Sequence, residues 1–287
     1  MHIQETRGLV SSSDARGCRP FLRWAGSKLK LIPALEAYWH TTHGTYIEPF
    51  AGSACLYFHL SPQKAVLGDN NAALIELYEV LRDRPSRIVR RLAHIPRNSE
   101  SYYRWRNIQP EALDKETRAL RLLYLNRHCF NGIFRTNDEG RFNVPFGTRL
   151  GQPLSAETIY ECAQRLRDVK LVAGDFMNTV RLAKPGDLVY MDPPFAMATK
   201  RDRRQYGHAS FSHSDIARLN DAMFALDATG VDFLVSYGDC PEARMLARNW
   251  NYRRVRVRRH VSGFASNRRN AYELIISNFI APLEGCA

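Results

Sequence analysis

The stretch at residues 188–195, which reads Leu-Val-Tyr-Met-Asp-Pro-Pro-Phe, constrains the fold more than any other part of the chain. Its four apolar residues predict a short buried strand. Pro193 and Pro194 end that strand, because proline lacks an N–H group and fixes φ. Asp192 and Phe195 are therefore expected at the carboxyl end of a strand, where open α/β sheets bind their ligands.

A carboxylate, rigid backbone carbonyls and an aromatic ring would then meet in one small space. This combination suits a flat ring that carries an amino group, because the oxygens can accept hydrogen bonds from the NH2 group. The motif alone is equally compatible with an ordinary polar turn, since a match of four residues is weak. Other parts of the chain have to decide between the two.

Apolar runs and helical patterns alternate along most of the sequence. Helices with one apolar face are expected between most of the runs, so the fold class is α/β with a doubly wound, mainly parallel sheet of about seven strands. The last two strands are close enough in sequence to pair antiparallel, which would reverse the C-terminal one. The predicted strands are residues 46–50, 65–69, 169–173, 188–191, 231–236, 252–260 and 271–279.

Two early segments have the layout of a nucleotide site. Gly52 lies between the strand at 46–50 and a helix that begins at Cys55. A strand, a glycine turn and a helix form such sites, although a single glycine is no dinucleotide fingerprint. Asp69 ends the next strand, about 20 residues further on, where an acid commonly binds ribose hydroxyls. Trp24 and Lys28 precede both segments and either line the mouth of this pocket or simply start a helix.

The amino-acid composition changes between residues 85 and 149. This segment is rich in Arg, Tyr and Asn and includes a helical run at 118–127. Asn-Gly and Glu-Gly turns at 131–132 and 139–140 predict a hairpin. Arg and Asn can each bond two atoms of a base edge, which favours a DNA-contacting insert over an ordinary polar loop. The expected organisation is a flexible tail at 1–18, a catalytic domain at 19–84 and 150–287, and a small, mostly helical recognition insert at 85–149.

The net charge of the chain favours a nucleic-acid partner. The 287 residues carry a formal net charge of +12, which would attract a polyanion, although runs of charge are more often solvated faces. The six cysteines and nine histidines show no metal-ligand spacing, so we expect free thiols in a reducing cytoplasm and no metal. No apolar run approaches the roughly 18 residues of a membrane span, so a cytoplasmic protein without a membrane partner is expected.

At this point the chain resembles the Dam-type DNA adenine-N6 methyltransferases. The resemblance covers nearly all of residues 20–280, in the family's order, and its most specific block is the long, idiosyncratic one at 123–147. A weaker match is RRHVSGFASNRRNAYELII at 258–276. The four main segments are FLRWAGSK at 21–28, YIEPFAGS at 46–53, LYLNRHCFNGIFRTNDEGRFNVPFG at 123–147 and LVYMDPPF at 188–195.

The resemblance implies a seven-stranded, Rossmann-like methyltransferase sheet and a monomer or weak dimer. It also implies methyl transfer from S-adenosylmethionine to an adenine flipped out of duplex DNA, within GATC or a related short site. The target adenine would be held by Asp192, Pro193, Pro194 and Phe195. The cofactor would be bound by Trp24, Lys28, Phe50, Gly52, Asp69, Asp175, Phe176 and Asp192. DNA would be bound by Arg127, Asn131, Ile133, Arg135, Asn137, Asn143, Pro145, Lys200 and Arg201.

The sequence departs from the family pattern in a few places. Phe195 replaces the usual tyrosine, which keeps stacking and loses a hydroxyl. Ala54 stands where a second glycine is common, and Thr148 follows Phe-Gly where a basic residue is common. Phe130 and the pair at 128–129 also differ, so the recognition sequence need not be the family's usual one.

Three alternatives remain open from the sequence. The first is methylation of cytosine at N4, although those enzymes more often begin the motif with Ser. The second is a non-catalytic DNA-binding protein on the same scaffold, and the third is a protein-glutamine methyltransferase, which usually has Asn in place of Asp192. All catalytic readings require that an oxygen of Asp192 faces space for a base and is not fully occupied by a salt bridge.

Overall fold

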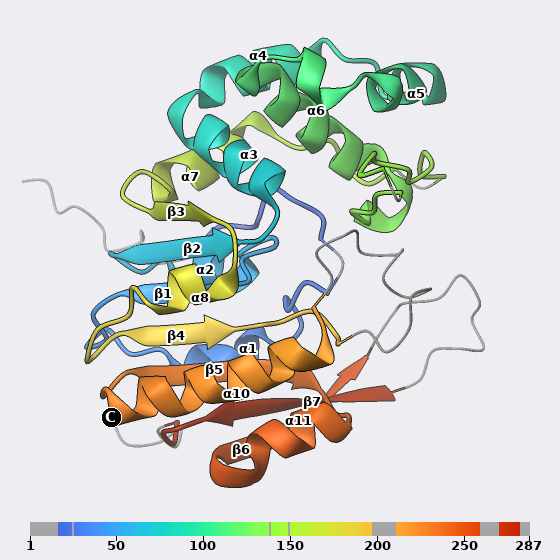
Figure 1. The fold of residues 1–287 in the computed structure, drawn as a ribbon. Helices are drawn as coiled ribbons and strands as arrows, with labels where there is room; N and C mark the ends of the chain where they lie inside the picture. Colours follow the sequence, from blue (N-terminus) through green and yellow to red (C-terminus); the bar gives the residue numbers. More distant parts are fainter. Residues whose placement is uncertain are drawn as a thin grey trace, which may run out of the picture.

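The computed structural model describes residues 17–24, 26–137, 139–148, 150–196, 211–258 and 270–281. These residues form a seven-stranded sheet with helices on both of its faces (Figure 1). The strands are β1 Tyr46–Glu48, β2 Ala65–Asp69, β3 Lys170–Ala173, β4 Leu188–Met191, β5 Asp232–Gly238, β6 Asn251–Arg258 and β7 Asn270–Ser277. The α-helices are α1 Ile32–Leu35, α2 Cys55–Leu60, α3 Ala72–Asp83, α4 Pro85–Ala93, α5 Ser99–Asn107, α6 Lys115–His128, α7 Ala156–Arg165, α8 Phe176–Val180, α10 His213–Ala228 and α11 Pro241–Leu246.

The strand order is β3-β2-β1-β4-β5-β7-β6. The pairs among β3, β2, β1, β4 and β5 are parallel, and β7 runs antiparallel to both β5 and β6. This confirms the predicted fold class, including the reversed C-terminal strand. The carboxyl ends of β1, β2, β4 and β5 therefore lie along one edge of the sheet, which is the edge where such folds place their sites.

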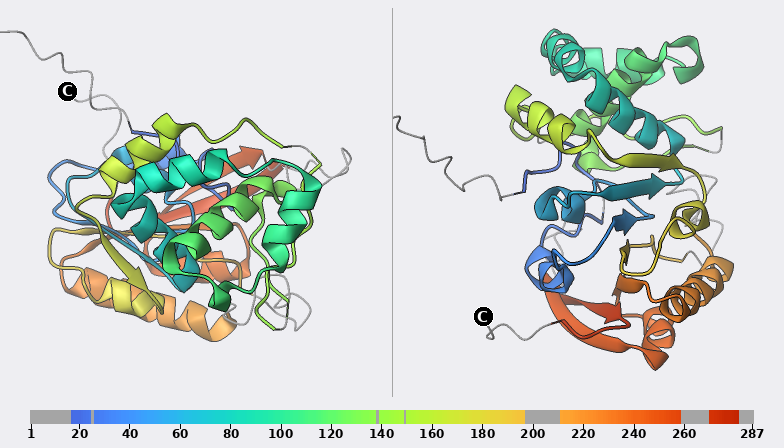
Figure 2. Two further views of the ribbon diagram at one scale, coloured as in Figure 1. Left: turned by 90° about the horizontal axis from the view of Figure 1, so that it is seen from above. Right: turned by 90° about the vertical axis from the view of Figure 1, so that its left-hand side faces the viewer.

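Alternation along the strands divides the core into two layers. Successive side chains of a strand point to opposite faces, so Tyr46 and Tyr190 pack with α2, α3 and α7, whereas Ile47 and Met191 pack with α8, α10 and α11. Figure 2 shows α1, α2 and α7 on one side of the sheet and α8 and α10 on the other. Both faces are covered, as a mainly parallel sheet requires.

The segment between α3 and α7 forms the helical part beyond the β3 edge of the sheet (Figure 1). It has an apolar cluster of its own, which includes Tyr102 from α5, Tyr124 from α6 and Phe142 from the turn-rich segment. Antiparallel bridges join Cys129 to Phe146 and Thr136 to Phe142, so the chain folds back as a hairpin around the turn that contains Gly140. Other residues of α6 belong to the core that the sheet shares with α3 and α7, so the insert is anchored to the sheet domain. The predicted domain boundaries stay a prediction.

Local signals explain where several helices begin. Asn71 caps α3 by accepting from Leu74 N–H at 3.2 Å, and Ser212 and Asp215 form a capping box on α10. A helix start at Lys28 was one of the two alternatives from the sequence, but α1 begins at Ile32 and Lys28 lies in the turn before it. Pro33 explains the difference, because proline is tolerated only in the first turn of a helix. Residues 1–16 of the predicted tail, residues 197–210 of the loop after Phe195 and residues 259–269 lie outside the described residues.

Candidate active site

Asp192 directly follows β4, between the parallel neighbours β1 and β5. Its side chain is 20% exposed, and its Oδ1 atom lies 3.0 Å from Lys28 Nζ. Ser236 Oγ, from β5, donates to the same oxygen at 3.1 Å and also pairs with the hydroxyl of Tyr190 at 2.9 Å. Both contacts are made to Oδ1. The salt bridge therefore occupies one oxygen of Asp192 and leaves the other for a ligand.

Lys28 bridges two acids. Its ammonium group lies 3.0 Å from Asp192 Oδ1 and 3.0 Å from Glu273 Oε2, and its side chain is only 10% exposed. The resemblance implies a cofactor role for Lys28, whereas the geometry places it against the motif acid. Glu273 lies on β7 within an apolar run and was not predicted as a site residue. Its one signal in the sequence was an acid inside a buried strand, where unpaired charge is rare.

Burial dominates the electrostatics of this cluster. Burial, with a smaller contribution from the charge of Glu273, raises the pKa of Asp192 to about 6 against the opposing effects of Lys28 and Ser236. The carboxyl group is therefore ionised at neutral pH, and it becomes protonated only below about pH 6. An ionised carboxylate in partly buried surroundings is a strong hydrogen-bond acceptor.

The two prolines place the motif aromatic at the surface. Pro193 is buried, Pro194 is exposed, and Phe195 is 41% exposed. The hydroxyl of Tyr237 accepts from Ala196 N–H at 2.8 Å and donates to the carbonyl of Pro194 at 3.4 Å. Its ring also meets Phe195 edge-on, with centroids 5.3 Å apart. Tyr237, which was not predicted, thus holds the turn that presents Phe195.

Asp69 and Gly52 are joined by a hydrogen bond. Asp69 Oδ2 accepts from Gly52 N–H at 3.0 Å, and Oδ1 accepts from Asn71 N–H at 2.8 Å. Each oxygen of a carboxylate can accept a second hydrogen bond, so the group can still hold two hydroxyls. Gly52 has a φ of 48°, and a Cβ there would lie 2.9 Å from Trp24 Cδ1. Glycine is therefore needed for both the backbone conformation and the close approach of Trp24.

The other predicted cofactor residues form a neighbouring aromatic group. The rings of Phe50 and Phe176 stack with centroids 5.1 Å apart, and the guanidinium of Arg218 lies 4.8 Å from the Phe176 centroid. Arg218, on α10, also pairs with Asp175 at 2.6 Å and lowers the pKa of that carboxyl. Asp175 in turn caps α8 through Met177 N–H. No sequence pattern marked Arg218, because it comes from a helix about 40 residues away that packs back onto the site.

The predicted DNA-reading residues differ in their surroundings. Arg135 Nε donates to Asn143 Oδ1 at 2.7 Å across the hairpin, and Asn131 and Pro145 are exposed. The side-chain carbonyl of Asn137 accepts two backbone N–H groups and so fixes the hairpin turn. Ile133 is half-buried in the insert cluster.

Two further sets of predicted DNA contacts have other positions. Arg127 is half-buried, and its guanidinium donates to the carbonyls of Gln152 and Phe21 at 3.0 and 3.5 Å. These contacts tie α6 to the N-terminal segment, so Arg127 already has a structural task. Lys200 and Arg201 lie outside the described residues.

One short segment connects the cofactor residues to the hairpin. The side chain of Asn126, on α6, accepts from Arg23 N–H at 3.0 Å and donates to the Arg23 carbonyl at 2.6 Å. Trp24, which follows Arg23 in the chain, stacks on Phe134 of the hairpin. The ring centroids are 5.7 Å apart and the ring planes are inclined by 16°. The segment from 21 to 28 thus contacts the insert at Trp24 and Asp192 at Lys28.

Glu48 is a second buried acid that the sequence did not mark as functional. It accepts from the Tyr46 hydroxyl at 2.9 Å, and burial raises its pKa well above the usual range. Among the described residues, no cluster of His, Cys, Asp and Glu has the arrangement of a metal site. No described helix has the length and apolarity that crossing a membrane requires.

A family model of D12 class N6 adenine-specific DNA methyltransferases matches residues 24–261. The chain belongs to this family. The methyltransferase is 33% identical over 272 residues to the type II methyltransferase M1.LlaDCHI of Lactococcus lactis subsp. cremoris, with 91% of this chain and 95% of that protein covered. It is 32% identical over 268 residues to the DNA adenine methylase of Serratia marcescens, with 90% and 97% covered. For the DNA adenine methylase of Escherichia coli K12 the identity is 31%, with 90% and 94% covered.

Membership confirms the predicted activity, which is methyl transfer to adenine N6 in DNA. It therefore disfavours cytosine-N4 and protein-glutamine methylation, and it disfavours a purely DNA-binding role. The roles of the individual residues of this methyltransferase stay predictions.

Proposed function

We propose that this methyltransferase uses S-adenosylmethionine to methylate an adenine that is flipped out of duplex DNA, within GATC or a related short site, as a monomer or weak dimer. The observation that supports this proposal most strongly is the set of contacts that the Asp192 carboxylate makes. Its Oδ1 is held by Lys28 and Ser236, which leaves Oδ2 for a ligand. Beside it, Pro194 and Phe195 are exposed at the edge of the sheet.

The residues of the motif address the main chemical difficulty of the reaction. The exocyclic nitrogen of adenine is a poor nucleophile, because its lone pair is delocalised into the ring. Asp192 Oδ2 and the carbonyl of Pro193 would accept its two N–H groups. These bonds favour a pyramidal nitrogen whose lone pair is directed away from the ring plane. Catalysis would then be mainly placement and electrostatics, and Asp192 need not remove a proton before attack.

The residues around Gly52 and Asp69 fit the methyl donor. Asp69 would hold the ribose hydroxyls, Trp24 would lie beside Gly52, and Phe50 and Phe176 would contact the adenine with Asp175. S-adenosylmethionine supplies an activated methyl group on a cationic sulfonium. Lys28, Asp192 and Glu273 together have two negative charges and one positive charge, so the cluster complements that cation. The activated donor needs no metal.

Phe195 would assist the flipped base. Extruding a base costs a few kcal/mol, and stacking on an aromatic ring returns roughly 1–3 kcal/mol. A phenylalanine can stack as a tyrosine does, so the lost hydroxyl does not remove this contribution. Tyr237 supports the ring through its edge-on contact and its bonds to the turn.

The hairpin would read the sequence around the target. Arg135 and Asn143 present side chains that can each bond two atoms of a base edge, and Asn131 and Pro145 lie exposed beside them. Because Trp24 stacks on Phe134, the reading element and the donor site share one rigid contact. Lys200 and Arg201 would bind the phosphate backbone.

The proposal is tested by identifying the product. Unmodified duplex DNA is incubated with the protein and S-adenosylmethionine, digested to nucleosides and analysed by mass spectrometry. N6-methyladenine is expected, and sequencing of the modified positions should place it in one short motif. N4-methylcytosine as the main product, or no transfer from this donor, would overturn the proposal.

A further inference from the structure

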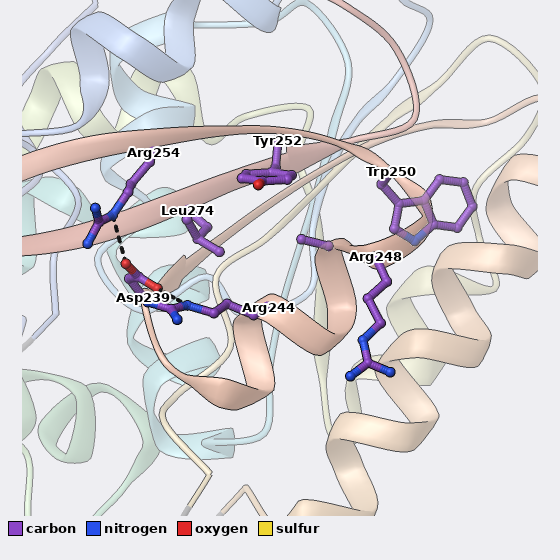
Figure 3. Close-up of a pocket in the computed structure, with 8 residues that line it drawn as sticks. Asp239, Arg244, Arg248, Trp250, Tyr252, Arg254 and Leu274 are labelled. Atoms are coloured by element: carbon purple, nitrogen blue, oxygen red, sulfur yellow. Dashed lines mark hydrogen bonds and ion pairs between the residues drawn. The ribbon is translucent and has the colours of Figure 1, made fainter.

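A second pocket lies at the far end of the sheet, between β6, β7 and α11 (Figure 3). Its volume is about 470 Å³, and its lining includes Asp239, Arg244, Arg248, Tyr252, Arg254 and Leu274. Three arginines against one acid give the lining a net charge of +2. A basic pocket of this size suits an anionic group.

The acid in the pocket orients two of the arginines. Asp239 is only 7% exposed in its side chain, and it pairs with Arg244 Nε at 2.7 Å and Arg254 Nε at 2.8 Å. Arg244 lowers the pKa of Asp239, so the carboxylate stays charged. Both ion pairs are made through Nε. Such fixed guanidinium forks match the oxygens of a phosphate.

Aromatic rings accompany the arginines. The guanidinium of Arg254 lies 3.8 Å from the centroid of Tyr272, and Tyr252 is exposed. Tyr252, Arg254 and Arg256 are spaced by two along β6, so they share one face of the strand. Arginines interleaved with aromatics are typical of surfaces that bind a nucleic-acid backbone.

An acid of the pocket, Asp239, lies on the same edge of the sheet as Asp192 of the candidate active site. Asp239 directly follows β5 and Asp192 directly follows β4, and these two strands are parallel neighbours. Both acids therefore lie on the carboxyl edge of the sheet. The recognition insert lies beyond β3, at the opposite end of the strand order (Figure 1). A duplex whose target base reaches Asp192 would thus have the insert on one side and the pocket on the other.

We propose that Arg244, Arg248 and Arg254 bind phosphates of the bound duplex on the flank opposite the recognition insert. This inference rests on the proposed function, because the position of the duplex follows from the target base at Asp192. The arginines would add affinity without sequence choice, since phosphate contacts fix position and carry no base information.

The test compares the double variant Arg244→Ala, Arg248→Ala with the matched control Arg181→Ala. Arg181 is an exposed arginine that directly follows α8, where the chain runs toward the start of β4 and away from the carboxyl edge. Affinity for a duplex that contains the mapped site is measured as a function of salt. Each lost phosphate contact reduces the slope of log K against log salt by about 0.9, so the double variant should lose about 1.8 and the control nothing. Shortening one flank of the duplex should weaken the wild type and leave the double variant unaffected.

An unchanged slope in the double variant would overturn the inference. So would a variant that loses affinity for inorganic phosphate or a free nucleotide and keeps its affinity for DNA, because the pocket would then serve a small anion. Failure of the proposed function is separable, since it would appear as a wild-type protein that produces no N6-methyladenine, whatever the slope.

Discussion

At the scale of single residues, Lys28 is placed between Asp192 and Glu273. One ammonium group cannot neutralise two carboxylates, so Asp192 keeps part of its negative charge in a nearly buried place. Buried charges are tolerated only when they are paired, which explains why Glu273, Lys28 and Ser236 surround this acid. Glu273 does not touch the proposed base position, and we assign it a positioning role through Lys28.

The Glu273→Gln variant should reveal this role in the pH profile. The pKa of Asp192 is about 6, and removing the charge of Glu273 should lower it, while Lys28, Glu48, Tyr190 and Cys55 stay in place. Ionised Asp192 is the active form, so the wild-type rate should fall about tenfold per unit below pH 6. The variant should show this fall at lower pH, with a reduced plateau because Lys28 then pairs only with Asp192.

Single-turnover methyl transfer between pH 4.5 and 8, a window of about two units around that pKa, measures the effect. The matched control is Glu79→Gln, which removes a partly exposed acid on α3 that pairs with Lys115. An acid limb in Glu273→Gln that coincides with the wild-type limb would mean that Glu273 is merely structural.

At the scale of secondary-structure elements, the hairpin between Cys129 and Phe146 is the part with the most specific chemistry. Arg135 Nε donates to Asn143 Oδ1, and Asn143 N–H donates back to the Arg135 carbonyl at 3.1 Å. This reciprocal pairing fixes one nitrogen of the guanidinium. Its terminal nitrogens could then bond two atoms of a guanine edge, which is the commonest specific contact of arginine.

Replacing Arg135 by alanine should relax sequence choice. A bidentate contact to a base provides about 1–3 kcal/mol of discrimination, so sites with a substitution at one position should be methylated roughly 5- to 150-fold more readily relative to the wild-type preference. Methylation of a random duplex library, read by sequencing, measures the change. Arg141→Ala on the same hairpin, where Arg141 pairs with Glu139, is the control. If both variants keep the wild-type motif, Arg135 does not read a base.

At the scale of the whole molecule, local signals were enough to predict the sheet. The strands at 65–69 and 188–191 have the predicted limits, because apolar runs that end in Asp or Pro are decided by their own residues. Asp192, Asp69 and Gly52 could be marked for the same reason. Each follows a strand at the edge where ligands bind.

The partners of these residues could not be predicted in this way. Glu273, Ser236 and Tyr237 lie inside apolar strands, and Arg218 lies on a helix whose pattern shows only which face is buried. Their roles depend on which strands become neighbours, and the order β4-β5-β7 is a property of the whole sheet. The contact of Lys28 with Asp192 joins positions more than 160 residues apart for the same reason.

The central claim is that the carboxylate of Asp192 holds the amino group of an extruded adenine. Single-turnover methyl transfer by Asp192→Ala, measured beside binding of the duplex and of S-adenosylmethionine, tests it most directly. Loss of one positioned hydrogen-bonding group at a reacting centre typically costs about 10²–10³ in rate, so transfer should fall by at least that factor while both affinities change less than about tenfold. A variant that still transfers methyl groups at a rate near that of the wild type would contradict the account.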